Sequence, residues 1–170
     1  ADYQLEAKHL KDFHSALQHR QDINVPKVFG AQTTKHIIAM EYMDGVDLST
    51  CVGFSQSQRD QIITTLLELF FEELFEFRQM QSDPNFANYL FDPRSSTLKL
   101  LDFGVSRDIP EAVLEGYRLL LSAATLNDKN KVIKAARDIG FFQDDISDQQ
   151  IETVISMFML ATTPLRTDTF

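Results

Sequence analysis

The tightest constraint on the fold comes from two short polar motifs joined by an apolar stretch. Asp83-Pro-Asn-Phe-Ala-Asn88 is rich in turn-forming residues, and Asp102-Phe103-Gly104 follows nineteen residues after Asp83. Between them, YLF and TLKLLDF have the composition of strands, and the intervening DPRSS is rich in turn formers, so we predict a β-hairpin. The hairpin returns the chain and carries chemistry-bearing side chains at its two ends.

Helical patterns flank this hairpin on both sides. Residues 2–19 predict an amphipathic helix without an obvious cap, and this abrupt opening leads us to expect a segment cut from something longer. The run from Ser55 to Met80 has a wide apolar face and predicts a deeply buried helix. Three more helices follow Gly104, and the residues that would cap them are Asp108 with Glu111, Asp128, and Ser147 with Gln150. Gly140 stands where a left-handed residue would end the second of these.

The segment between the first two helices predicts a second hairpin. VPKVFG and KHIIAMEYM are rich in β-branched and aromatic residues and lie between Pro26, Gly30 and Gly45. With the helices, these strands indicate an α+β chain that is mostly helical.

Composition excludes several classes of protein. The net charge of −9 disfavours tight binding to nucleic acid, which depends on Lys and Arg neutralising phosphates. One cysteine, Cys51, cannot form an intrachain disulfide, and no apolar run is long enough to span a bilayer. The 44% hydrophobic content of the 170 residues suits one ordinary core.

The two polar motifs fit the needs of phosphoryl transfer. That reaction needs a group to orient the acceptor and oxygen ligands to hold Mg²⁺ against the phosphates. Asp83 and Asn88 have the D-x-x-x-x-N spacing of a kinase catalytic loop, and the hairpin would bring Asp102 to the other side of the phosphates. Gly104 would permit a sharp turn and Phe103 would anchor it in apolar surroundings. Taken alone, Asp83 and Asn88 also fit a turn held by side chain to backbone hydrogen bonds.

The stretch MQSDPNFANYLFDPRSSTLKLLDFG resembles the D-P-N-x-x-N and L-L-D-F-G signature of the UbiB family of atypical kinase-like proteins. The likeness extends upstream to DYQLEA and downstream to LNDKNKVIKAARDIGFF. It implies a protein-kinase-like fold, with residues 1–43 as the last elements of a small lobe and 44–170 as the large lobe.

The resemblance also assigns roles. It implies that Asp83 is catalytic, that Asn88 is a metal ligand and that Asp102 is the principal metal ligand. Gln81 and Ser82 stand where ordinary protein kinases have histidine and arginine, which puts conventional phosphorylation of proteins in doubt.

Five further residues take expected roles by the same resemblance. Glu6 matches the helix glutamate that pairs with a phosphate-binding lysine, although it could equally be a solvent-facing carboxylate. IIAMEYMDG is similar to a kinase hinge, so the backbone of Glu41 and Met43 would bind the adenine edge, with Met40 behind it. Core filling is the alternative for both methionines. Asp47 could reach a ribose hydroxyl or could simply be a turn carboxylate.

The resemblance therefore implies an ATP- and Mg²⁺-dependent atypical kinase or ATPase that supports ubiquinone biosynthesis. Its expected partners are quinone-precursor lipids, ubiquinone-biosynthesis enzymes and a membrane surface, in a bacterial cytoplasm or on the matrix side of the mitochondrial inner membrane. Two alternatives stay open: a nucleotide-sensing pseudokinase scaffold, and a small-molecule phosphotransferase of the aminoglycoside or choline kinase type. Because the phosphate-covering loop and the ATP lysine are not among these residues, we expect the 170 residues alone to bind ATP poorly and to be inactive.

Overall fold

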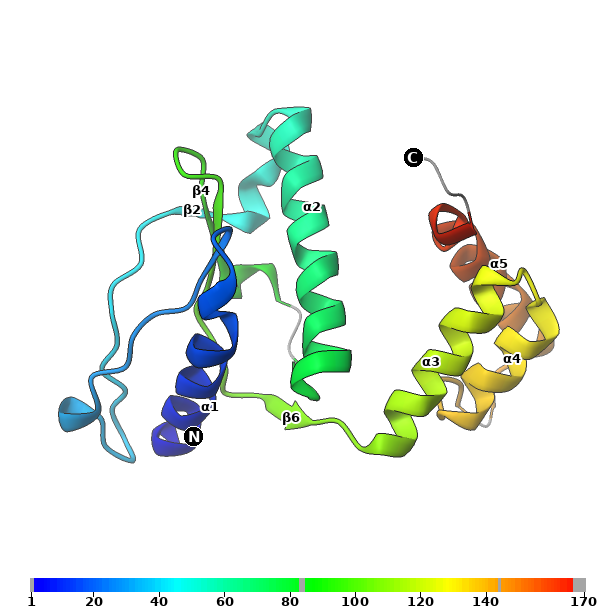
Figure 1. The fold of residues 1–170 in the computed structure, drawn as a ribbon, viewed down its shortest axis with the longest axis horizontal. Helices are drawn as coiled ribbons and strands as arrows, with labels where there is room; N and C mark the ends of the chain where they lie inside the picture. Colours follow the sequence, from blue (N-terminus) through cyan, green and yellow to red (C-terminus); the bar gives the residue numbers. More distant parts are fainter. Residues whose placement is uncertain (1, 83–84, 144, 167–170) are drawn as a thin grey trace. The chain divides into compact units, whose positions relative to one another are not determined.

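The computed structural model describes residues 2–82, 85–143 and 145–166 (Figure 1). Its contacts divide the chain into two compact units, residues 1–108 and residues 109–170. The boundary between lobes that the sequence suggests at residue 43 stays a prediction.

A mixed four-stranded sheet organises the first unit. Its order is β1 (Ile23–Asn24), β5 (Thr97–Leu100), β4 (Tyr89–Asp92) and β2 (Val46–Asp47), with β1 parallel to β5 and the other neighbours antiparallel. Strands β4 and β5 form the hairpin predicted between the two polar motifs, with Tyr89 opposite Leu100.

A second, two-stranded sheet closes the ends of this hairpin. Strand β3 (Gln79–Gln81) precedes the first polar motif, and β6 (Ser106–Asp108) follows the second. They pair antiparallel with Gln81 opposite Ser106, and the next residue, Ser82, donates its N–H to the Val105 carbonyl (3.0 Å). The chain therefore enters and leaves the hairpin region at the same place, where β3 and β6 pair.

The predicted hairpin over residues 25–43 is present only as isolated bridges. Val28 pairs with Met40 and Thr34 with Ile37, both antiparallel, but no continuous strand forms. A 3₁₀ turn at Gly30–Gln32 interrupts the pairing.

Two helices cover the core of the first unit, and Figure 1 shows both beside the β4–β5 hairpin. Helix α1 (Tyr3–Ala16) has a cap that the sequence analysis missed, since the Asp2 carboxylate accepts the Gln4 N–H (3.1 Å). Helix α2 (Gln56–Phe71) starts at the Ser55 capping box and passes into a π-helical segment, Glu72–Phe77. The helical segment ends at Arg78, whose φ of 55° is left-handed. The observed helix therefore stops short of Met80, where the predicted helix ended.

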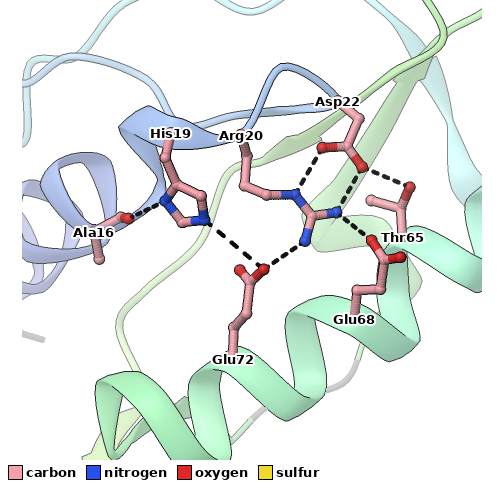
Figure 2. A network of polar contacts seen from close by, with 7 residues as sticks. All are labelled: Ala16, His19, Arg20, Asp22, Thr65, Glu68 and Glu72. Atoms are coloured by element: carbon pink, nitrogen blue, oxygen red, sulfur yellow. Dashed lines mark hydrogen bonds and ion pairs between the residues drawn. The ribbon is translucent and has the colours of Figure 1, made fainter.

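Arg20 ties the end of the α1 region to α2 (Figure 2). Its guanidinium is 11% exposed and donates to the carboxylates of Asp22, Glu68 and Glu72 at 2.6 to 2.7 Å. Thr65 donates to Asp22 as well, and the hydrogen bond from Arg20 lowers the pKa of Asp22 to about 2. Burial of the Arg20 and Glu72 side chains is tolerated because each has a partner of opposite sign, whereas Glu68 reaches the cluster from an exposed position.

The second unit is a small helical cluster. It contains α3 (Glu111–Thr125), α4 (Lys129–Asp138) and α5 (Asp148–Ala161). Asp128 caps α4 and the Ser147 box caps α5, as predicted. The predicted capping box of α3 is wrong, because Asp108 ends β6 and α3 starts after Pro110 without a side-chain cap. Short 3₁₀ turns complete the chain at Leu17–His19, Leu48–Gly53, Phe86–Asn88 and Thr163–Arg166.

Candidate nucleotide and metal site

The predicted catalytic residue Asp83 lies outside the described residues. The described residues on either side of the gap are held by hydrogen bonds. Ser82 pairs with Val105, and Asn85 caps the 3₁₀ turn Phe86–Asn88 by accepting the Ala87 N–H (3.0 Å). The loop therefore starts beside the residues that directly follow Asp102-Phe103-Gly104.

The segments that carry Asn88 and Asp102 lie side by side at the open end of the hairpin. The carbonyl of Asn88 accepts the N–H of Leu101, the residue before Asp102 (2.9 Å). The side-chain Nδ2 of Asn88 is buried and has no hydrogen-bond partner among the residues that the structure describes. An unpaired buried amide is costly, and a half-turn of the amide would put the oxygen there, the atom type that Mg²⁺ prefers.

Two carboxylates face Gly104. The Asp102 Oδ1 atom accepts the Gly104 N–H (2.8 Å), and a Cβ placed on Gly104 would lie 3.2 Å from that oxygen and 3.3 Å from Glu6 Oε2. Burial first, and the charge of Asp102 second, raise the pKa of Glu6, while His9 lowers it. Glu6 is half-buried rather than fully solvent-facing, and a cation near both acids would relieve their repulsion. The described residues alone contain no cluster of three acidic, His or Cys side chains able to hold a metal.

Phe103 anchors the turn between these acids in the core. Its side chain is fully buried, and its ring lies 4.9 Å from the ring of Phe13, which in turn meets Phe77 edge-on at 6.3 Å. His9 Nδ1 donates to the Phe103 carbonyl (3.3 Å). The turn that carries Asp102 is thus fastened to α1 and to the end of the α2 region.

Gln81 is a site residue that sequence reasoning named only as a departure from protein kinases. Its side-chain amide donates to the Asp102 carbonyl and accepts the Tyr89 hydroxyl (2.7 Å), and it is 7% exposed. Both ends of the amide are therefore used, and they fix the backbone of Asp102 relative to β3 and β4. Its position two residues before Asp83 was the only sequence feature named above that pointed to a role near the site.

The residues predicted to form the hinge line a cavity of about 500 Å³. Met40, Glu41 and Met43 form one wall, and Leu90 and Leu101 form another. Leu101 directly precedes Asp102, so the cavity lies beside the segment that carries this candidate metal ligand, although neither Asp102 nor Asn88 lines it. The Glu41 N–H is already bonded to the Lys27 carbonyl (2.8 Å), which leaves the Glu41 carbonyl and the Met43 backbone for a ligand.

Asp47 does not line this cavity. Its carboxylate accepts the Ser49 N–H (2.8 Å) at the start of the 3₁₀ turn Leu48–Gly53. Hydrogen bonds from the Ser49 side chain first, and from its N–H second, lower the pKa of Asp47. In this structure it acts as a cap, while ribose contact stays a prediction.

Glu73, in the π-helical segment, is a buried acid next to Gln81. Its side chain is 5% exposed and accepts the Gln81 N–H (3.3 Å), and burial raises its pKa to about 8. It lies on the wall of a second cavity, of about 420 Å³, together with Tyr89 and Phe86.

Replacing Glu73 by glutamine is expected to remove the loss of stability that wild type suffers as pH rises. Between the ordinary pKa of 4.5 and about 8, folded Glu73 keeps a proton that the unfolded chain has lost, so stability falls as pH rises across this window. Glutamine stays neutral, so the variant should gain roughly 2–4 kcal/mol relative to wild type between pH 5 and pH 8. Denaturant unfolding across this pH range measures the gain, with exposed Glu76→Gln as the control. A constant difference between Glu73→Gln and wild type at all pH values would contradict it.

The fold and the order of the two polar motifs define a kinase-like protein. A solved structure, the Rv3197–erythromycin complex from Mycobacterium tuberculosis, is similar to 94% of this chain, and the match covers 41% of the chain in that structure. The TM-score is 0.73 and the sequence identity is 22%. That likeness supports the fold alone. The chain belongs to the ABC1 atypical kinase-like family, whose domain matches residues 1–136, as the UbiB resemblance predicted.

Two curated relatives are mitochondrial atypical kinases. COQ8B of Danio rerio is 37% identical over 158 residues, which are 91% of this chain and 25% of that protein. COQ8 of Saccharomyces cerevisiae is 33% identical over 160 residues, 92% of this chain and 32% of that protein. This chain thus spans a quarter to a third of the length of these relatives. Among its described residues, none of the helices has the length and apolar character needed to cross a bilayer.

Proposed function

We propose that the protein binds Mg²⁺-ATP and acts as an atypical kinase or ATPase of the UbiB type in support of ubiquinone biosynthesis. The observation that carries the proposal is the cavity lined by the predicted hinge, residues 40–43, and by Leu101, because Leu101 directly precedes Asp102 and donates its N–H to the Asn88 carbonyl. Adenine would bind the hinge backbone, and the phosphates would extend toward the two side chains. Asp83 would orient an acceptor hydroxyl or water.

In this proposal ATP brings Mg²⁺, which would supply charge neutralisation for the phosphates. Asp102 and the amide oxygen of Asn88 would hold the ion. Gln81 would keep the Asp102 backbone in place through the hydrogen bond to its carbonyl. Glu6 would pair with a lysine from the small lobe, of which residues 1–43 would be the last part.

The proposed biological setting rests on the resemblance to the UbiB family, and the names of the two relatives add only that those proteins are mitochondrial. Quinone-precursor lipids, ubiquinone-biosynthesis enzymes and a membrane surface are the proposed partners. The mitochondrial matrix side of the inner membrane, or a bacterial cytoplasm, is the proposed location.

The test uses the full-length protein. Calorimetry should detect Mg²⁺-dependent ATP binding, and phosphate release with and without membrane lipid should report turnover. Binding without any turnover that depends on Asp83 would favour the scaffold alternative, which the unusual Gln81 and Ser82 make worth testing. Stoichiometric phosphorylation of an amino alcohol or an aminoglycoside would favour the small-molecule kinase. Absence of nucleotide binding would refute all three.

A further inference from the structure

Lys99 is a buried cation in the middle of β5. It is 9% exposed, and lysine is rarely buried to this degree unless its ammonium group is paired. Its Nζ atom donates to the backbone carbonyl of Asp44 and lies 3.6 Å from Asp92 Oδ2. The ammonium therefore joins the sheet to the segment that follows the hinge.

That segment forms part of the wall of the proposed nucleotide cavity. Asp44 lies between Met43 and Gly45, which both line the cavity, and Lys99 is paired across the strands with Leu90, which lines it as well. The backbone here is tightly held, since a Cβ on Gly45 would lie only 2.9 Å from Leu90 Cβ and 3.2 Å from the Phe91 carbonyl oxygen. Gly45 limits how near the segment can come to β4, and Lys99 limits how far it can move away.

We propose that Lys99 is a positioning residue that sets the base selectivity of the cavity by holding the Asp44 carbonyl. The inference rests on the proposed function, in which the Glu41 carbonyl and the Met43 backbone read the edge of adenine. Backbone hydrogen bonds are directional and weaken steeply when misaligned. A site whose polar groups pair with adenine rejects guanine because some of those groups would be left without partners. If the wall of the cavity is loosened, we expect the difference between the two affinities to shrink before binding is lost.

The competing explanation is that Lys99 only stabilises the hairpin through its ion pair with Asp92. Asp92→Asn separates the two explanations. Asp92 Oδ1 also accepts the Arg94 N–H (3.0 Å), and asparagine keeps that bond while it removes the charge. Lys99→Met, of similar length, removes both the donor to Asp44 and the ion pair.

The experiment measures affinities of the full-length protein for ATP and GTP in the presence of Mg²⁺. We expect Lys99→Met to weaken ATP binding about 10-fold and GTP binding less, so that the ratio of the two affinities falls. Asp92→Asn should keep the ratio of the wild type. Lys99→Arg, which keeps the charge but replaces the compact ammonium by a planar fork, should also lower the ratio, and it serves as the test if Lys99→Met does not fold.

Hydrogen exchange without nucleotide tests the anchor independently of ATP binding. Peptides covering residues 41–48 should exchange faster in Lys99→Met than in wild type and Asp92→Asn. Unchanged exchange and an unchanged ATP to GTP ratio in the lysine variants would overturn the inference, as would an equal effect of Asp92→Asn. If wild type binds neither nucleotide while exchange still rises in Lys99→Met, the anchor is supported, but both the selectivity role and the proposed function are overturned.

Discussion

An Asp102→Asn variant of the full-length protein should lose at least ~100-fold in nucleotide turnover while keeping its fold. The turn is expected to survive because the amide oxygen of asparagine can still accept the Gly104 N–H that Asp102 Oδ1 accepts at 2.8 Å. What disappears is the negative charge beside Glu6, at the place proposed for Mg²⁺. Losing one preorganised charge of this kind typically costs 10²–10³-fold in rate, roughly 3–4 kcal/mol.

Steady-state phosphate release with saturating Mg²⁺-ATP measures this loss. Asp128→Asn is the matched control, because Asp128 caps α4 in the other unit and asparagine is an equally good cap. Turnover of Asp102→Asn at the rate of the control would remove Asp102 from the proposed mechanism.

Phe103→Ala should destabilise the first unit by about 3–5 kcal/mol, the usual cost of deleting a buried phenylalanine ring. The ring is fully buried and packs against the ring of Phe13 in α1. Denaturant unfolding measures the loss. Phe29→Ala removes the same atoms from a side chain that is 47% exposed, and it should cost much less.

Phe103→Leu distinguishes packing from a role in positioning Asp102. Leucine keeps most of the apolar volume, so stability should largely return. If turnover also returns, the ring acts only through packing. Equal destabilisation by Phe103→Ala and Phe29→Ala would show that the Phe103 ring is not part of the core.

The sequence predicts those parts of the fold that depend on neighbouring residues. The β4–β5 hairpin and the capping box at Ser147 are local, and the structure has both. The expected cap at Asp108 failed because pairing of β6 with β3 takes that residue into a strand. Such pairing joins positions far apart in the chain, and no local pattern encodes it.

The same distinction holds for the candidate site. Motif spacing predicted that Asn88 and Asp102 lie near each other, and one backbone hydrogen bond, from Leu101 to Asn88, joins their segments. The spacing gave no sign of the amide of Gln81 on the Asp102 carbonyl, or of the buried Glu73 behind it, because each depends on tertiary packing.

The Arg20 cluster would act as the pivot in any tilt of α1. Arg20 is held by three carboxylates, whereas Glu6 lies fourteen residues earlier, ~20 Å away at the rise of a helix. At this distance, a tilt of ~10° about Arg20 would displace Glu6 by ~3–4 Å, while the end of the helix at Arg20 would hardly move. A displacement of this size is enough to break a hydrogen bond. Spin labels at the two ends of α1 should therefore report unequal displacements when nucleotide binds, with the larger one near Glu6.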